Sequence, residues 1–422
     1  MPPSRLSIST AVVSATVALA LATDGRTLVA QDAALARAQA LLEQAPLIDG
    51  HNDLPWTLRE TFGGDLAKVD LRKRGATVDT DIPRLHEGRV SGQFWSVFLP
   101  SGLTNPARTQ LEQIELARRM IDAYPGTFLF ATRAADVERA RKAHKIASFL
   151  GMENGQAIEN SLGSLRAFYT LGVRYMTLTH GKHNDWADSA TDTAVHNGLT
   201  PFGREVVREM NRLGMLVDIS HVSPDVMRQV LDVSEAPVIF SHSSARALVD
   251  HPRNVPDDVL ARVARNGGVV NVTFIPAFVS SATAAWGKGL ETSLFNAKTT
   301  AEMAKMEKDY AAVHGLAPAA TLVQVADHID HVARVAGHDH VGIGSDFYGS
   351  PDEPRGLEDV SRFPELFAEL IRRGWSDADL KKLAGGNLLR VLAAAEVTAT
   401  RLAAQRPPST ATIEELDAKK AQ

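Results

Sequence analysis

Residues Met215–His242 read MLVDISHVSPDVMRQVLDVSEAPVIFSH. Two short apolar runs, each ending in histidine, flank Pro224–Val233, where apolar residues recur at helical spacing. The helix has a clear start signal, because Ser223 can cap it and Pro224 suits its first turn. A strand, a helix and a second strand in this order are typical of a parallel sheet.

The same rhythm recurs along the chain of 422 residues. Eight apolar runs have the length of a strand, and most of them end in or beside His, Asp or Glu. These runs are Leu47–Leu54, Gln93–Leu99, Lys145–Glu153, Val173–His180, Met215–His221, Val238–His242, Val269–Phe274 and Val341–Phe347. A buried strand has no packing reason to end in such residues, whereas the strand tips of a (β/α)8 TIM barrel jointly build one active site. We therefore predict an α/β fold, a single (β/α)8 barrel over residues 31–398, in preference to a doubly wound open sheet.

Two regions depart from this rhythm. Pro276–Pro318 has no obvious barrel strand but contains the helix-like stretch Thr300–Val313, so we expect an elaborated loop after the seventh strand, on the active-site face. Ser361–Arg373 and Ser376–Leu392 have helical spacing and should close the barrel after the eighth strand. Residues 399–422 are expected to form a helical or frayed tail.

The N-terminus has the pattern of an export signal. Arg5 precedes the short apolar stretch Ala11–Ala22, so residues 1–30 are predicted to be a signal peptide that is cleaved after Ala22 or Ala30. The protein is then expected in the bacterial periplasm or outside the cell; the alternative is an N-terminal extension of a cytosolic protein. No other segment has the length and apolarity of a membrane span, and the polar C-terminus predicts no lipid anchor.

The composition narrows the possible chemistry. The formal net charge is −5 and no long single-sign charge run occurs, so no nucleic-acid partner is expected. The chain has no cysteine, which excludes disulfides, thiolate catalysis and cysteine-type zinc sites. Any metal site must therefore use imidazole and carboxylate ligands.

Such ligands occur at the predicted strand ends. His51 and Asp53 are two residues apart, so they share one face of a strand and suit zinc or a similar divalent ion. His221 and His242 end consecutive strands at the same barrel mouth. Glu153 is either a solvated acid in a turn or a carboxylate that bridges two metals. With Glu153 as the bridge, His51 and Asp53 hold one metal, and His221 and His242 hold the other.

Two ions about 3.5–4 Å apart lower the pKa of a bridging water, hold it as hydroxide and polarise the bond that it attacks. The pattern thus indicates a hydrolase that acts on a carbonyl or phosphoryl centre. Asp346 suits a general acid/base or a partner for a substrate ammonium. His180 suits an additional ligand or a group that polarises a carbonyl oxygen, and Arg253, if it is not simply solvated, suits a clamp for a carboxylate.

Other polar residues are weaker candidates for the site. Five of them are His183, Asp185, Asp188, His196 and His251. A separate group, which lies along a predicted helix and the turn into the last strand, comprises His328, His331, His338 and His340. Because that group is far from the C-terminal end of its strand, we interpret it as surface or structural.

Several motifs, taken together, closely resemble the membrane (renal) dipeptidase family of the amidohydrolase-like barrels. They are IDGHNDLPW, GMENG with SLGSLRAFYTLGVRYMTLTH, NDWADS, DISHVS, APVIFSHSSAR with RNVPDDVL, and VGIGSDFYG, which occur in the family's order between about Pro46 and Leu392. The resemblance implies a dipeptidase with two Zn2+ per chain, and it places His51 and Asp53 on one zinc, His221 and His242 on the other, and Glu153 between them.

The resemblance also assigns the substrate contacts. It implies that His180 contacts the scissile carbonyl oxygen, that Arg253 binds the C-terminal carboxylate of the dipeptide, and that Asp346 lies near the free amine as a proton shuttle. Members of the family often accept a D-residue at the C-terminal position, and they are commonly homodimers. Without cysteine, such a dimer would have to be non-covalent. The loop Pro276–Pro318 is where we expect substrate preference to diverge.

Two alternatives remain open at this point. The first is a related amidohydrolase that acts on N-acyl amino acids or on another small amide, ester or phosphoester. The second is a non-catalytic metal- or peptide-binding protein, against which the complete ligand set and Asp346 argue, because a binding protein needs no proton shuttle.

Overall fold

A computed structural model describes residues 33–75, 77–290, 293–294, 297 and 299–418 of the protein. The predicted export segment, residues 1–30, lies outside the described residues. Within the described ranges, none of the helices combines the length and the apolar character that crossing a lipid bilayer requires.

Eight parallel strands form a closed barrel. Neighbours pair in the order β2, β1, β9, β8, β7, β6, β5 and β4, and β4 pairs back onto β2. The strands are β1 (Leu47–Asn52), β2 (Val90–Phe98), β4 (Ile146–Glu153), β5 (Val173–Thr177), β6 (Leu216–Asp218), β7 (Ile239–Phe240), β8 (Val269–Val272) and β9 (Val341–Ile343). Closure of the sheet confirms the (β/α)8 prediction and excludes the open doubly wound sheet.

Most strands end earlier than the sequence pattern predicted. β6 ends at Asp218 and β9 at Ile343, so His221 and Asp346 lie in the turns that follow. The predicted runs were too long because the apolar residues Ile219 and Phe347 are also buried, although they lie beyond the strand ends. A hydrophobic pattern records burial and does not show where the ladder of backbone hydrogen bonds stops.

A further short strand, β3 (Phe128–Phe130), was not predicted. It pairs with residues 146–148 at the start of β4, whereas β5 pairs with the later part of β4 from Leu150 onward. Three residues are too few to show the alternation by which a strand is recognised in a sequence.

Helices surround the barrel and connect its strands. Those on its sides are α2 (Leu54–Phe62), α3 (Ile82–Glu87), α4 (Pro106–Ala123), α5 (Ala135–Lys142), α6 (Leu162–Thr170), α7 (Pro201–Leu213), α8 (Pro224–Val233), α9 (Asp257–Asn266), α14 (Leu322–Ala336) and α15 (Phe363–Arg372). α8 begins where the sequence predicted, and the Ser223 side chain accepts a hydrogen bond from the backbone N–H of Val226 at 3.3 Å.

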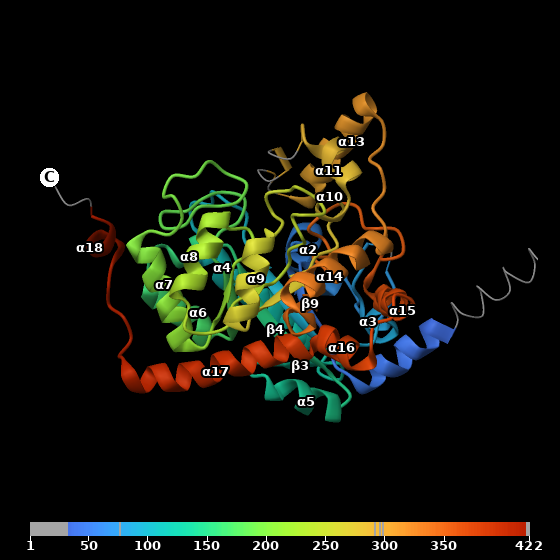
Figure 1. The fold of residues 1–422 in the computed structure, drawn as a ribbon, viewed down its shortest axis with the longest axis horizontal. Helices are drawn as coiled ribbons and strands as arrows, with labels where there is room; N and C mark the ends of the chain where they lie inside the picture. Colours follow the sequence, from blue (N-terminus) through green and yellow to red (C-terminus); the bar gives the residue numbers. More distant parts are fainter. Residues whose placement is uncertain (1–32, 76, 291–292, 295–296, 298, 419–422) are drawn as a thin grey trace, which may run out of the picture.

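The N-terminal ends of the strands are closed by packed side chains. Inside the barrel, Phe94 stacks on Phe149 with ring centroids 4.7 Å apart, and Tyr175 lies 5.4 Å from Phe94. α16 (Asp377–Lys381) leads into α17 (Asn387–Gln405), which runs across this end (Figure 1). Leu388 of α17 belongs to the same buried cluster. A Cβ atom at Gly151 would lie 1.9 Å from the Tyr175 ring, so glycine is required there. Beyond α17, the short helix α18 (Ile413–Asp417) packs near α7.

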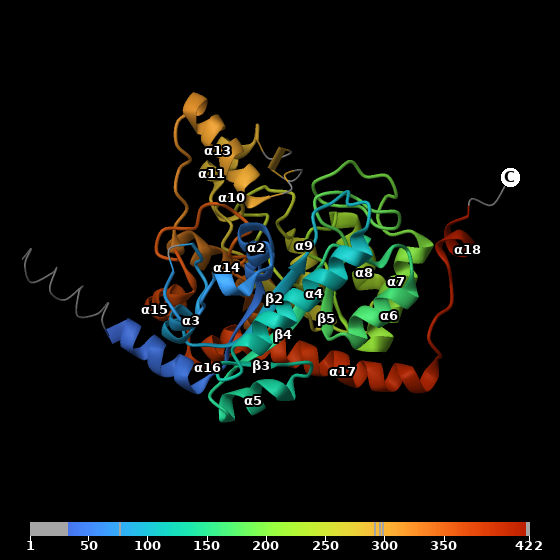
Figure 2. The same ribbon diagram turned by 180° about the vertical axis from the view of Figure 1, so that it is seen from behind.

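A long segment covers the opposite end of the barrel. Between β8 and α14 the chain forms α10 (Pro276–Val279), α11 (Ser281–Gly287) and α13 (Thr300–His314), which rise away from α17 in both views (Figures 1 and 2). This confirms the predicted elaboration after the seventh barrel strand. Several of its residues line a pocket that also contains the residues at the C-terminal ends of the strands.

Candidate active site

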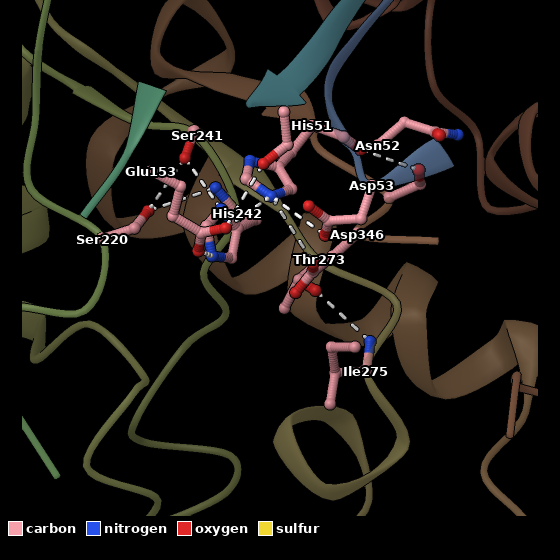
Figure 3. A network of polar contacts seen from close by, with 12 residues as sticks. His51, Asn52, Asp53, Glu153, Ser220, Ser241, His242, Thr273, Ile275 and Asp346 are labelled. Carbon is pink, nitrogen blue, oxygen red and sulfur yellow. Dashed lines mark hydrogen bonds and ion pairs between the residues drawn. The ribbon is translucent and has the colours of Figure 1, made fainter. Parts of the chain in front are cut away.

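Glu153, the last residue of β4, lies among three buried histidines (Figure 3). Its Oε2 atom is 3.4 Å from Nε2 of His51, and its Oε1 atom is 2.9 Å from Nε2 of His221 and 3.3 Å from Nε2 of His242. The two carboxylate oxygens therefore face different histidines. This arrangement suits a carboxylate that is shared between two cations.

The remaining predicted ligand, Asp53, follows directly after β1. Its Oδ2 atom lies 3.3 Å from Nε2 of His51, and Oδ1 of Asp346 lies 3.8 Å from the same nitrogen (Figure 3). Asp53, Asp346 and His51 thus form a group in which one potential ligand atom from each residue lies within 4.8 Å of the others. On geometry alone, Asp346 is a possible ligand as well as a possible proton carrier.

The residues present fit a pair of metal ions. Nε2 of His51 is buried without a hydrogen-bond partner, and Nε2 of His221 lies only 2.9 Å from Nε2 of His242. Buried ring nitrogens that converge on carboxylates, with no cysteine in the chain, form the donor set that zinc and similar divalent ions prefer. His180 also reaches this region, because its Nε2 atom lies 3.9 Å from Oε1 of Glu153.

Two of these side chains are presented by unusual backbone conformations. His221 and Asp346 both have φ of 65°, in the left-handed region that residues with a Cβ rarely adopt. The Asp346 turn is held by its own N–H, which donates to the carbonyl of His51 at 3.1 Å. A Cβ atom at Gly349 would lie 2.5 Å from the Asp346 carboxylate, so glycine leaves room for this acid. Strain of this kind is concentrated at functional sites.

The groups that orient the histidines were not predicted from the sequence. The hydroxyl of Tyr175 lies 2.8 Å from Nδ1 of His51, and Oγ of Ser241 lies 2.8 Å from Nδ1 of His242. Ser241 in turn donates to Asp218 at 2.5 Å, so its oxygen is left to accept from the imidazole N–H. With a metal bound, Nδ1 would carry the proton in both rings and the Nε2 lone pairs would face the metal.

Two buried aspartates brace the turns that carry the ligands. Asp49 accepts hydrogen bonds from the N–H of Ser345 at 2.7 Å and from its hydroxyl at 2.6 Å, next to Asp346. Asp218 accepts from the backbone N–H groups of Ser220 at 3.0 Å and Ser241 at 2.9 Å. The only local signal for either residue is an acid inside an apolar run, as in LIDG and LVDIS.

Arg253 brings a positive charge to the pocket. It is 1% exposed, yet burial lowers the pKa of its guanidinium only to about 10, so it stays charged at neutral pH. Its Nη2 donates to the carbonyl of His242 at 3.2 Å, and its Nη1 lies 3.4 Å from Oγ of Ser243. The Phe278 ring lies 5.2 Å from the guanidinium carbon. Arg253 therefore faces the pocket on an apolar support.

Burial and nearby charges shift the pKa values of the acids in opposite directions. Burial alone would raise the pKa of Glu153, but His51 and the hydrogen bonds from His221 and His242 hold it well below its ordinary value. Burial raises the pKa of Asp346 well above its ordinary value, although His51 opposes the shift. One carboxylate thus stays ionised while the other binds a proton readily, which is a pattern typical of acid–base sites.

The pocket joins these groups to apolar walls. Its polar lining includes Asp53, Glu153, His180, His221, His251, Arg253 and Asp346, and its apolar lining includes Trp56, Phe98, Ile275, Phe278, Trp286 and Met303. All eight residues that the sequence singled out therefore lie in this pocket or, as for His51 and His242, directly contact residues that line it. Of the weaker candidates, only His251 lines it.

Three other weaker candidates make contacts within the fold. His183 lies 2.8 Å from Asp192, and Asp188 accepts from the backbone N–H of Gly198 at 2.8 Å. His331 is buried and lies 2.7 Å from Asp257. These contacts fasten loops and helices, and none of the three residues lines the pocket.

Comparison with known proteins identifies similar molecules. The family model described as membrane dipeptidase (peptidase family M19) matches residues 35–406. Similar solved structures include the probable dipeptidase PvdM from Pseudomonas aeruginosa, with 27% identity, a TM-score of 0.75, and coverage of 87% of this chain and 99% of that chain. Dipeptidase AC, a metallo peptidase of family M19, has 26% identity, a TM-score of 0.68, and coverage of 83% and 98%. A metallo peptidase from Rhodobacter sphaeroides, liganded with a phosphinate mimic of the dipeptide L-Ala-D-Ala, has 25% identity, a TM-score of 0.69, and coverage of 83% and 99%.

Proposed function

This chain belongs to the membrane dipeptidase family, peptidase family M19, and is a metallo-dipeptidase; from that premise we propose that it hydrolyses free dipeptides with two zinc ions. The observation that carries the proposal is the position of Glu153, whose Oε2 faces His51 while its Oε1 faces His221 and His242. A carboxylate placed in this way can neutralise two cations at once.

The five metal-binding residues divide into two sets around that carboxylate. His51 and Asp53 would hold one zinc, His221 and His242 would hold the other, and Glu153 would bind both. Bound there, zinc would supply a more acidic water as the nucleophile and a polarised scissile carbonyl. Tyr175 and Ser241 would keep the histidines in the tautomer that ligation needs.

The substrate is recognised at both of its charged ends. Arg253 binds the C-terminal carboxylate, for which a planar guanidinium is the best protein donor. Asp346 receives the free ammonium group of the N-terminal residue. Because both groups line one pocket, we expect a zwitterion of dipeptide length to bridge them and a longer peptide to be excluded.

Two further groups act on the scissile bond. His180 lies in the same pocket, and burial lowers the pKa of its imidazole, so the neutral ring donates a hydrogen bond to the carbonyl oxygen. Asp346 takes a proton from the attacking water and delivers it to the leaving nitrogen. Its raised pKa suits a group that must bind and release a proton in each turnover.

The proposal extends to stereochemistry, location and assembly. Tolerance of a D-residue at the C-terminal position is supported by the similar Rhodobacter sphaeroides enzyme, which was solved with a mimic of L-Ala-D-Ala. The pattern at residues 1–30 supports export to the periplasm or the medium. We further propose a non-covalent homodimer, as the family resemblance implies.

A related amidohydrolase that acts on N-acyl amino acids is the second candidate. Such a substrate has the carboxylate for Arg253 but no ammonium, so it leaves Asp346 buried without a charged partner. The Asp346 carboxylate therefore favours a free dipeptide over an N-acyl amino acid as the substrate.

The test is to measure metal content and activity on the same sample. The mature protein would be assayed on L-L and L-D dipeptides, tripeptides and N-acetylated dipeptides, and its zinc would be counted. About two zinc ions per chain, with cleavage of free dipeptides alone, are expected. Cleavage of N-acetylated dipeptides at equal rates would move the function to the second candidate, and a single metal per chain would refute the binuclear site.

A further inference from the structure

The loop that carries Arg253 is closed on itself by backbone hydrogen bonds. It follows β7 and the predicted ligand His242, and the N–H of Val255 donates to the carbonyl of Ser244 at 2.8 Å. The N–H of Arg246 donates to the carbonyl of Val255 at 3.0 Å, so the two arms of the loop form a parallel bridge around Ala245. We call residues 243–256 the clamp loop.

The N–H of Ala245 is directed out of the clamp loop. It donates to Nδ1 of His328 at 3.0 Å. His328 lies on α14, 83 residues further along the chain, and is 1% exposed. Burial lowers the pKa of its imidazole to about 4, so the ring is neutral at physiological pH and Nδ1 is free to accept.

The same imidazole lies beside the wall of the pocket. Its environment includes the backbone of Val279, the last residue of α10. The clamp loop reaches α10 at a second point, because the Asn254 side chain donates to the carbonyl of Phe278 at 2.8 Å. Phe278 supports the guanidinium of Arg253 at 5.2 Å. His328 therefore stands where α14, the clamp loop and α10 meet.

We propose that His328 is a positioning residue for Arg253, which it holds in place through the N–H of Ala245. His328 is not among the residues that line the pocket with the predicted site. The inference rests on the proposed function of Arg253 as the clamp for the substrate carboxylate. It reverses part of the sequence interpretation, in which His328 was one of four histidines with only a surface or structural role.

The proposal predicts a selective defect. Loss of the acceptor would loosen Arg253, so binding of a free dipeptide would weaken while turnover of an amidated dipeptide, which lacks the carboxylate, would hardly change. The readout is the ratio of kcat/KM for a dipeptide to kcat/KM for its C-terminal amide. This ratio does not depend on how much of a sample is folded.

Three substitutions at one position separate the roles of the side chain. In His328→Asn the carbonyl oxygen is three bonds from Cα, as Nδ1 is, and it can accept from Ala245. In His328→Gln the oxygen is one bond further away, and His328→Leu removes the acceptor. His331→Leu is the matched control, since His331 lies one turn along α14 and bonds Asp257 at 2.7 Å instead of the clamp loop.

We expect His328→Leu and His328→Gln to lower the ratio by about tenfold, mainly through KM of the free dipeptide, because small displacements of a binding group have large effects on rate. His328→Asn and His331→Leu should keep the wild-type ratio. An unchanged ratio in His328→Leu and His328→Gln, or equal losses on acid and amide, would overturn the proposal; if His328→Leu does not fold, the polar His328→Gln decides. A wild-type enzyme that does not prefer the acid would instead refute the role of Arg253.

Discussion

The phenolic oxygen of Tyr175 lies 2.8 Å from Nδ1 of His51, on the opposite side of the imidazole ring from Asp53 and Glu153. Burial raises the pKa of Tyr175, so the hydroxyl stays neutral. A neutral hydroxyl that accepts from Nδ1 keeps Nε2 on the side of the carboxylates, where its lone pair would bind a metal. This one contact links the packed interior of the barrel to the site at its mouth.

Removing that hydroxyl should weaken the binding of one metal ion more than that of the other. In Tyr175→Phe the ring of His51 loses its partner, and affinity for one of two zinc ions is expected to fall by about 10- to 100-fold. Competition with a chromogenic chelator measures both affinities. Tyr124→Phe is the control, because Tyr124 bonds the N–H of Leu71 far from the site. Equal affinities in Tyr175→Phe and wild type would show that the contact does not tune the metal.

Asp346 can be tested as a proton carrier separately from metal binding. Asp346→Asn keeps the shape of the side chain but cannot carry the proton, so kcat should fall by about 10²- to 10⁴-fold with zinc content unchanged. Turnover assays and metal analysis of the same preparation distinguish the outcomes. Loss of one zinc would make Asp346 a ligand, as its place in a group with His51 and Asp53 allows.

Side-chain preference at the N-terminal residue should depend on pH. Glu307 and Asp352 line the pocket together with Asp346, and burial and the nearby Asp352 raise the pKa of Glu307 to about 7. Because an acid loses its proton above its pKa, Glu307 becomes an anion as the pH rises through about 7, and attraction for a cationic side chain grows.

The measurement compares KM for dipeptides with an N-terminal lysine and with an N-terminal norleucine at about pH 6 and about pH 8. At the higher pH, KM for the lysine dipeptide should fall a few-fold relative to KM for the norleucine dipeptide. The factor is modest because Glu307 is only half-buried. Glu307→Gln should remove most of this change in relative KM. A change of the same size in Glu307→Gln would show that another titrating group causes it.

Gly151 should be essential for stability, because its missing side chain makes room for Tyr175. Gly151→Ala places a methyl group 1.9 Å from the tyrosine ring and should cost at least about 1–3 kcal/mol of unfolding free energy. Gly126→Ala is the control, since no atom lies within 4 Å of its added Cβ. Urea unfolding compares the two, and equal stabilities would mean that the barrel interior can relax around the methyl group.

The parts of the site that the sequence predicted share one property. Glu153, His221 and His242 each come at or just beyond the end of an apolar run, so position along the chain alone placed them at one barrel mouth. β4 pairs with β2 and closes the barrel, so the ends of all strands surround one mouth. A repeating strand–helix pattern predicts this closure.

The groups behind the ligands could not be predicted in this way. Tyr175 bonds a residue 124 positions away, and Asp49 bonds Ser345 across 296 positions. A tyrosine in an apolar strand fits a core equally well, so nothing local distinguishes it. The left-handed backbone conformation of His221 and Asp346 could not be predicted either. Glycine is the usual sequence signal for positive φ, and neither residue is glycine.

The aromatic layer of Phe94, Phe149 and Tyr175, backed by α17, closes the N-terminal end of the barrel beneath the pocket. Cleavage of one dipeptide leaves two amino acids in a space that has its mouth under α10, α11 and α13. We therefore expect substrate to enter and products to leave at the C-terminal end of the barrel, beneath these helices. Release of products, as well as cleavage of the bond, is then expected to contribute to the turnover rate.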